Sequence, residues 1–303
     1  MAVLALLGCL KVPNSRDENS HPLDWTGGLL SILTVGGFVF GIIEGPEQGW
    51  DAVPTITGLV IGAVSLIAFI FVERKSKYPL LDPRLFKLRG FSAGTLSITL
   101  QFFGQFGFIF VGMQYLQFVA HKTPLQAAIQ LLWMPLVVLP GSRIVGVLSR
   151  RVPQKFLGSV GLVIFGYALL HFSRLGVEFD YWYFTTGILL FGLGMSLAAT
   201  PATVAITSAL PSSKQGVASA VNDTAREVGS ALGIAILGAA LTNTYKIAME
   251  KATVGLPQVF ADKLQSSVAF TAMPKPDNLP PSIDWNKLVS DGLNAFHDGV
   301  GLA

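Results

Sequence analysis

Charged side chains are scarce in this 303-residue chain: Asp, Glu, Lys and Arg together make up only 13% of it. A soluble domain usually carries about twice that share. Hydrophobic residues make up 51%, and the charge is excluded from long apolar blocks, as is typical of membrane-spanning segments. The length alone would allow one or two soluble domains, but the composition argues against them.

Cysteine and histidine are scarce as well. The single cysteine, Cys9, excludes an internal disulfide framework, and the four histidines lie in different segments, so we expect neither a metal site nor a cofactor. No nucleophile–base pair or phosphate-binding loop stands out. Glycines spaced four apart indicate helix packing here, because no strand precedes them. An integral-membrane enzyme is disfavoured, since no buried His, Asp or Ser constellation repeats at helical spacing.

Acidic residues almost balance the basic ones, and the net charge is +3. The basic residues are concentrated in short loops between apolar blocks. Membrane orientation explains such a distribution better than nucleic-acid binding does, so no nucleic-acid partner is expected.

The apolar blocks predict an all-α integral membrane protein with about seven complete transmembrane helices. A partial helix is expected at the N-terminus, and another is expected to start near the C-terminus. The expected complete spans are 27–43, 53–72, 90–120, 124–148, 156–173, 181–210 and 211–245. The run 90–120 exceeds a usual span, so it must tilt, bend or emerge at one end. Thr123 and Gln126 predict a capping box that starts the next helix.

Charge in the short loops predicts the orientation. The loops 73–90, 149–155 and 211–217 carry most of the positive charge, whereas 44–52, 119–124 and 174–180 carry almost none. Their alternation places the first set and the N-terminus in the cytoplasm of a multi-pass cell-membrane protein. The segment 246–292 is then a long external loop.

The most informative stretch reads GVASAVNDTAREVGSALGIAILG and covers residues 216–238. Polar residues occur within two turns near its start, and Gly229 and Gly233 then form a small-xxx-small ridge for close helix packing, with Gly238 further along. This stretch resembles the penultimate helix of the fourteen-span drug:proton antiporters of the major facilitator superfamily. A second patch, LDW at 23–25 followed by EGPEQGW at 44–50, resembles the extra central helix of that branch.

The resemblance implies an efflux pump in which two helical bundles rock around a central site, exporting hydrophobic drugs in exchange for protons. The chain looks like the central extra helices plus most of the C-terminal bundle. The missing N-terminal bundle is an expected partner, from the same gene or a separate chain. The expected divisions are 1–24 (tail of a preceding helix and cytoplasmic connector), 25–72 (two extra central helices), 73–89 (basic cytoplasmic loop), 90–245 (C-terminal bundle helices), 246–292 (external loop) and 293–303 (start of a truncated last helix).

The sharpest candidates for gating or coupling are the polar residues of that helix. They are Asn222, Asp223, Arg226 and Glu227. Ionisable groups in a membrane helix face a cavity or a partner, because exposure to lipid is costly. A self-neutralising helix start at the headgroup level is the alternative, and the sequence leaves both interpretations open.

Gln101 and Gln105 lie four apart on one face of the third complete span, with Phe102 and Phe106 beside them. Amides next to aromatic rings suit a pathway for lipophilic cations, which are bound by cation–π contacts. Interhelical hydrogen bonding is the more generic use of such amides and the preferred interpretation.

Two further candidates lie at helix ends. Glu44 could carry a proton at an apolar boundary, but closing a turn with Gly45 is the favoured interpretation. The loop that contains Gly146, Arg150 and Arg151 resembles the superfamily's cytoplasmic loop motif, with Arg150 in place of the usual acid and Pro153 in place of a glycine. The loss of that acid puts normal gating in doubt.

Two functional hypotheses remain. The first is proton-coupled efflux of hydrophobic or cationic drugs, with the lipid bilayer, a small hydrophobic substrate and protons as partners. The second is a truncated, non-transporting membrane fragment or a structural membrane subunit.

Overall fold

The computed structural model describes residues 24–77, 79–272, 275 and 283–302, and within them the chain is helical without strands. Seven segments are long and apolar enough to cross a membrane, which confirms the predicted fold class and number of complete spans. The helices are α2 (Trp25–Gln48), α3 (Val53–Lys75), α4 (Arg89–Gln114), α5 (Pro124–Leu131), α6 (Trp133–Leu148), α7 (Gln154–Phe172), α8 (Tyr181–Ser208), α9 (Gln215–Ala252), α10 (Gln258–Ser266) and α11 (Trp285–Leu302).

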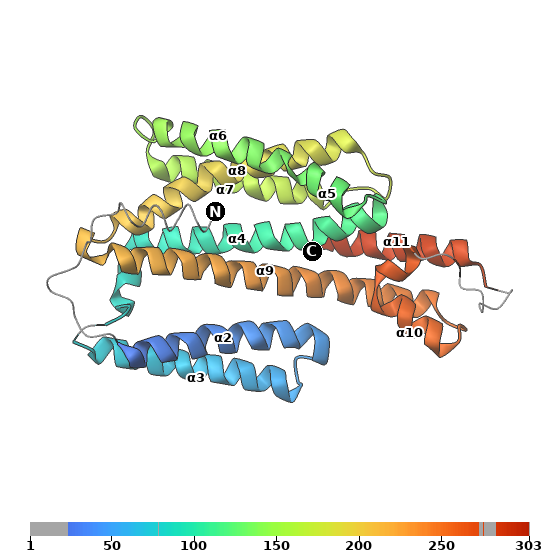
Figure 1. Ribbon diagram of the computed structural model, residues 1–303, viewed down its shortest axis with the longest axis horizontal. Helices are drawn as coiled ribbons and strands as arrows, with labels where there is room; N and C mark the ends of the chain where they lie inside the picture. The colour runs from blue at the N-terminus through green and yellow to red at the C-terminus, as the bar shows by residue number, and fades with distance from the viewer. Residues whose placement is uncertain (1–23, 78, 273–274, 276–282, 303) are drawn as a thin grey trace, which may run out of the picture.

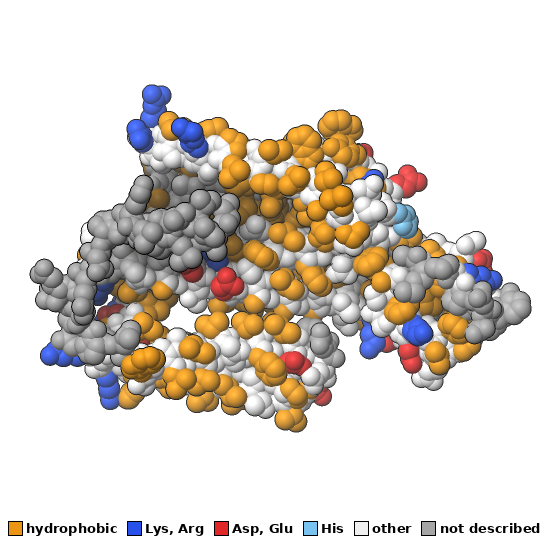
Figure 2. All heavy atoms as spheres, viewed as in Figure 1, with side chains coloured by type: hydrophobic (Ala, Val, Ile, Leu, Met, Phe, Trp, Pro, Cys, Tyr) orange, Lys and Arg blue, Asp and Glu red, His pale blue; other side chains and the backbone are white. Residues whose placement is uncertain are grey.

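Helices α4 and α9 run side by side through the middle of the molecule (Figure 1). Helices α6, α7 and α8 form a layer on one side of them, and the α2–α3 hairpin lies on the other side, against α9. Helix α11 packs on α9. Figure 2 shows hydrophobic side chains along the flanks of the helices, with most charged side chains near the helix ends, as a membrane-spanning bundle requires.

Glycines bring α2 and α3 into backbone contact. A Cβ added to Gly37 would lie 2.6 Å from the Gly62 backbone nitrogen and 2.9 Å from the Gly58 carbonyl oxygen. Only a residue without a side chain allows this approach, which is the usual way for two membrane helices to pack tightly. The hairpin is therefore closed along its length by its own small residues.

The turn of this hairpin is shorter than expected. We predicted that the first span ends at 43 and that Glu44 begins the turn, but α2 continues through Glu44 to Gln48. Gly49 ends the helix with a φ of 105°, and its N–H donates to the Gly45 carbonyl at 2.9 Å. A left-handed glycine stops a helix sharply, so the turn begins at Gly49.

Two of the expected spans are interrupted near one end or in the middle. The long run 90–120 ends in a π-helical turn, η2 (Tyr115–Val119), and His121 then takes a φ of 51°. The capping box is confirmed: Gln126 N–H donates to Thr123 Oγ1 at 3.3 Å, and Thr123 N–H donates to Gln126 Oε1 at 3.0 Å. The helix that we expected over 124–148 breaks at Leu132, because Pro135 has no N–H to continue the hydrogen-bond ladder.

Much of the stretch 246–292 is helical rather than an open loop. Helix α9 runs on to Ala252, the short helix α10 follows, and α11 begins at Trp285. Tyr245 Oη donates to the Leu264 carbonyl at 2.9 Å, so α10 folds back onto α9. Residues 273–274 and 276–282 of this stretch, and residues 1–23 with the predicted N-terminal helix tail, lie outside the described residues.

Candidate functional site: the polar cluster between α4 and α9

The central pair α4–α9 is drawn together by two glycines of α9. A Cβ on Gly229 would overlap the Thr99 carbonyl oxygen, and a Cβ on Gly233 would overlap that of Phe103. Gly238, one turn further on, lies against the Phe110 ring, whose nearest atom would be 2.9 Å from an added Cβ. The face of α4 that meets α9 therefore carries Thr99, Phe103 and Phe110, and Gln101 and Gln105 lie on the other side of α4.

Gln101 and Gln105 lie one turn apart on α4. Gln101 is fully buried, and its Nε2 donates to the Ser97 carbonyl at 3.0 Å and to Ser97 Oγ at 2.9 Å. These hydrogen bonds stay within α4 and tie the amide to its own helix. The Oε1 atoms of both glutamines are buried without a hydrogen-bond partner among the described residues.

Arg226 reaches from α9 onto the aromatic side chains of α4. Its guanidinium carbon lies 5.2 Å from the centroid of the Phe102 ring, which is cation–π geometry, and its Nε is buried without a partner. The Phe102 and Phe106 rings stack with their centroids 6.0 Å apart. We call Gln101, Phe102, Gln105, Phe106 and Arg226 the α4–α9 polar cluster, after the two helices that carry them. Among the described residues, no hydrogen bond joins either glutamine to Arg226.

The other polar residues near the start of α9 lie outside this cluster. Asn222 is buried against α8, where Thr203 Oγ1 donates to its Oδ1 at 3.4 Å. Asp223 and Glu227 are exposed, and no ion pair joins either of them to Arg226. Residues 222 and 226 share one helix face whereas 223 and 227 share another, so the four side chains do not form a single group. A self-neutralising helix start would need the acids to pair with Arg226.

The two candidates at helix ends lie on other elements. Glu44 is in the last turns of α2 and accepts a hydrogen bond from Gln48 Nε2. Gly146 is near the end of α6, where nothing lies close to the place of a Cβ, and Arg150 and Arg151 are exposed in the turn after it. None of these residues joins the α4–α9 polar cluster.

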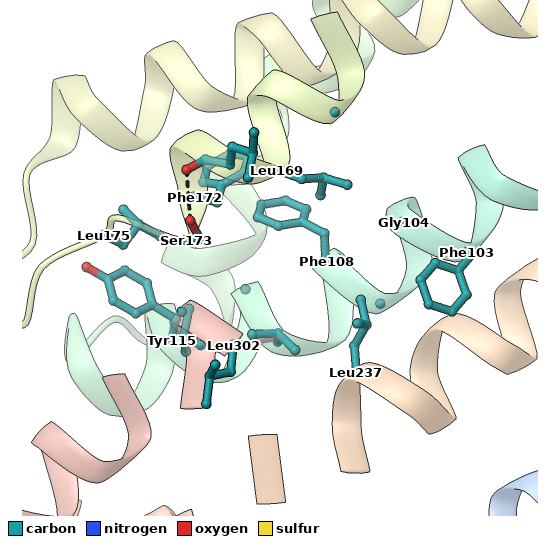
Figure 3. A pocket seen from close by; sticks show the side chains of 17 residues that line it. Phe103, Gly104, Phe108, Tyr115, Leu169, Phe172, Ser173, Leu175, Leu237 and Leu302 are labelled. Atoms are coloured by element: carbon teal, nitrogen blue, oxygen red, sulfur yellow. Dashed lines mark hydrogen bonds between the residues drawn. The ribbon is translucent and has the colours of Figure 1, made fainter. Parts of the chain in front are cut away.

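A cavity of about 410 Å³ lies on the neighbouring face of α4, between α4, α7, α9 and α11 (Figure 3). Its wall is mostly apolar, and its two hydroxyls are already bonded: Tyr115 Oη donates to the Gly176 carbonyl at 2.7 Å, and Ser173 Oγ to the Leu170 carbonyl at 2.9 Å. The cavity therefore offers mainly van der Waals contact.

Sequence reasoning missed this cavity. Gly104 and Gly107 line it from α4, and Phe103 lies beside them (Figure 3). The two glycines could not have revealed it, because both are closely packed: a Cβ on Gly104 would lie 2.8 Å from the Phe165 ring, and one on Gly107 would overlap Leu237. None of the glutamines of the polar cluster lines the cavity.

The cluster has a specific chemical character. Two amide oxygens can accept hydrogen bonds, one guanidinium N–H can donate, and a stacked pair of aromatic rings lies beside the guanidinium. Buried polar groups without partners are costly, so each of these groups favours a molecule or a partner surface that supplies its missing hydrogen bond.

Seven apolar spans define a polytopic membrane protein. The chain belongs to the Major Facilitator Superfamily, whose family profile matches residues 25–234. Membership confirms the predicted superfamily, and it classes the chain with carriers and not with enzymes.

Relatives with drug-resistance names are similar to the chain. It is 31% identical over 242 residues to the multidrug resistance protein Stp of Mycobacterium tuberculosis, covering 79% of this chain and 44% of Stp. It is 29% identical over 304 residues to the multidrug efflux pump LfrA of Mycolicibacterium smegmatis, covering 98% and 58%. It is 31% identical over 249 residues to the puromycin resistance protein pur8 of Streptomyces alboniger, covering 80% and 49%. The chain thus spans about half the length of these relatives.

Proposed function

We propose that this chain is the central and C-terminal part of a proton-coupled exporter of hydrophobic or cationic drugs that works by alternating access. It supplies two extra central helices and most of the second bundle of a fourteen-span transporter. The first bundle comes from the same gene or from a separate chain. Helices of both bundles would then face the transport path.

The observation that carries this proposal is the α4–α9 polar cluster. A guanidinium with an unpartnered N–H lies over one of two stacked aromatic rings, and two amides with unpartnered oxygens lie on the same helix as the rings, well inside the spans. Polar groups inside a membrane helix are retained where they face a pathway or a partner. Aromatic rings suit lipophilic cations, and the names of three relatives refer to multidrug or antibiotic resistance.

An export assay tests the function. We expect cells without their own drug exporters to accumulate less ethidium and to survive more puromycin when they produce the chain, either alone or together with the N-terminal half of LfrA. Adding a protonophore should abolish the difference if protons drive export. A correctly inserted chain that changes neither property, alone or combined, would support the non-transporting alternative and contradict the proposal.

The proposed orientation places the N-terminus, 73–90, 149–155 and 211–217 in the cytoplasm. Exposed Gln48 and Leu80 lie at opposite ends of the α2–α3 hairpin and report on it. In a Cys9→Ser background, we expect Gln48→Cys to react with a membrane-impermeant thiol reagent in intact cells and Leu80→Cys to react only after lysis. Labelling of both in the same compartment would contradict the topology.

A further inference from the structure

Glu73 is a buried acid that the export proposal does not use. It lies in the last turns of α3, and only 1% of its surface is exposed. The Leu81 backbone N–H donates to its Oε2 at 3.2 Å, whereas its Oε1 has no partner. A carboxylate buried beside an apolar helix is costly unless each oxygen is satisfied.

Asp24 presents the matching half of this arrangement. It is the N-cap of α2, and its Oδ1 accepts from the Gly27 N–H at 2.7 Å. Its Oδ2 is buried without a partner. Glu73 Oε1 occupies the place that a Cβ on Gly27 would take, and Asp24 Oδ2 lies 3.0 Å from that place. Both unpartnered carboxylate oxygens therefore lie beside Gly27, in the first turn of α2.

Among the described residues, the charges around the pair do not neutralise it. Asp82, the other charged group that acts on Glu73, is itself an acid, and it caps the short helix η1 (Pro83–Lys87) by accepting from the Arg84 N–H at 2.9 Å. At the end of α3, Arg74 and Lys75 are exposed, and Lys75 Nζ lies 4.0 Å from the Phe71 ring centroid. No described Lys or Arg forms an ion pair with Asp24 or Glu73.

A metal ion fits this place poorly. Hard cations bind six or more oxygen ligands. Here the backbone groups that approach the two carboxyls are N–H donors, and the described residues contain no group of three or more metal-ligand side chains. A shared proton needs only two oxygens, and both unpartnered oxygens lie beside Gly27.

We propose that Asp24 and Glu73 form a protonation site, in which one shared proton is held between Oδ2 of Asp24 and Oε1 of Glu73. The O–H of one carboxyl group donates to the carboxylate oxygen of the other. Adjacent carboxylates favour such sharing because two like charges in contact cannot both ionise freely. The proton comes from water and returns to water.

The shared proton joins three segments of the chain. They are the first turn of α2, the end of α3, and the linker that leads through Leu81 and η1 to α4. Losing the proton leaves two carboxylates side by side, and their repulsion separates α2 from α3 at this end of the hairpin. The inference rests on this geometry alone and stands whether or not the chain exports drugs.

Infrared difference spectroscopy on the purified full chain in detergent tests the site. A protonated carboxyl group has a carbonyl stretch that an ionised one lacks, and exchange into D2O shifts it. We expect the wild type to show this band at neutral pH. We expect both Glu73→Gln and Asp24→Asn to remove it, because each replaces one of the two partners. Asp51→Asn, which changes an exposed acid at the other end of the hairpin, should leave it unchanged.

Folding of each variant is checked by its helical circular dichroism and by a single elution peak. Glu73→Gln keeps an acceptor for Leu81 and gains an N–H for Asp24, so it should remain folded. If one variant does not fold, the other one decides. A wild-type chain without the band, or a folded variant of either residue that retains it in full, overturns the proposal.

Discussion

The helix pairs α2–α3 and α4–α9 are packed in the same way but differ in the buried polar atoms that lack hydrogen-bond partners. Glycines bring the backbones together in both pairs. The buried unpartnered side-chain atoms of the described residues fall only in these two places. At the hairpin both atoms are carboxylate oxygens, whereas α4–α9 combines two amide oxygens with a guanidinium N–H. The first place needs only a proton, but the second needs both a hydrogen-bond donor for the amides and an acceptor for the guanidinium.

The pairs also differ in how far they depend on their surroundings. Helices α4 and α9 lie at the centre and contact α8, α11 and the hairpin, whereas α2–α3 meets the rest of the bundle along one side (Figure 1). A substitution that disturbs the α4–α9 contact should therefore affect the whole fold, whereas one that disturbs the α2–α3 hairpin should have a local effect.

The largest effect is expected from Gly233→Ala. The added Cβ would overlap the Phe103 carbonyl oxygen, so α4 and α9 must move apart and lose their packing. We expect the free energy of unfolding in detergent to fall by about 3 kcal/mol or more. Gly146→Ala is the matched control: it has open space at its Cβ and should be neutral or slightly stabilising. Equal stability of the two variants would show that α4 and α9 are not tightly packed at Gly233.

A smaller effect is expected from Gly37→Ala in the hairpin. Its Cβ would lie 2.6 Å from the Gly62 nitrogen, which forces α2 away from α3 but leaves α4 and α9 in contact. We expect the free energy of unfolding to fall by about 1–2 kcal/mol, and we expect amide exchange to become faster only in α2 and α3. Faster exchange throughout α4 and α9 would remove the distinction between the two pairs.

Arg226→Ala tests the α4–α9 polar cluster with little cost in stability. The cation–π contact is worth about 1 kcal/mol, so the variant should fold and insert. If Arg226 faces the transport path, export should fall about tenfold, equivalent to about 1.4 kcal/mol. Thr224→Ala, on an exposed position of the same helix, should export normally. Unchanged efflux from folded Arg226→Ala would assign the residue a purely structural role.

The smallest effect on stability is expected from Gln105→Leu. It removes an amide oxygen that has no partner, so the free energy of unfolding should stay within about 0.5 kcal/mol of the wild type. Export of cationic drugs should nevertheless weaken. The matched control is Gln114→Leu, the same change at another half-buried position of α4. Full export after Gln105→Leu would remove this residue from the pathway.

The spans could be predicted from the sequence because the residue patterns that identify them are local. Uncharged blocks of sufficient length, the Thr123–Gln126 capping box and the Gly229–Gly233 ridge each act within one helix or on one face of it. The break at Leu132 has a local cause as well, because Pro135 has no N–H to bond the carbonyl one turn earlier.

The protonation site could not be found in this way. Glu73 stands next to Arg74 and Lys75, so the sequence placed it in a basic, solvated loop. Its burial depends on Gly27, which lies 46 positions earlier in the chain and offers no side chain to fill the space. Likewise, local polarity grouped Asp223 and Glu227 with Arg226, although the helix turns them to another face. Tertiary partners decide both outcomes.

The short turn between α2 and α3 has a consequence for how this protein can be assembled or altered. Two consecutive spans return the chain to the side of the membrane on which it began. The pair therefore leaves the membrane orientation of α4 and of the helices after it unchanged. Such a self-packed pair of helices can be gained, lost or exchanged as a module, while every later helix keeps its orientation in the membrane.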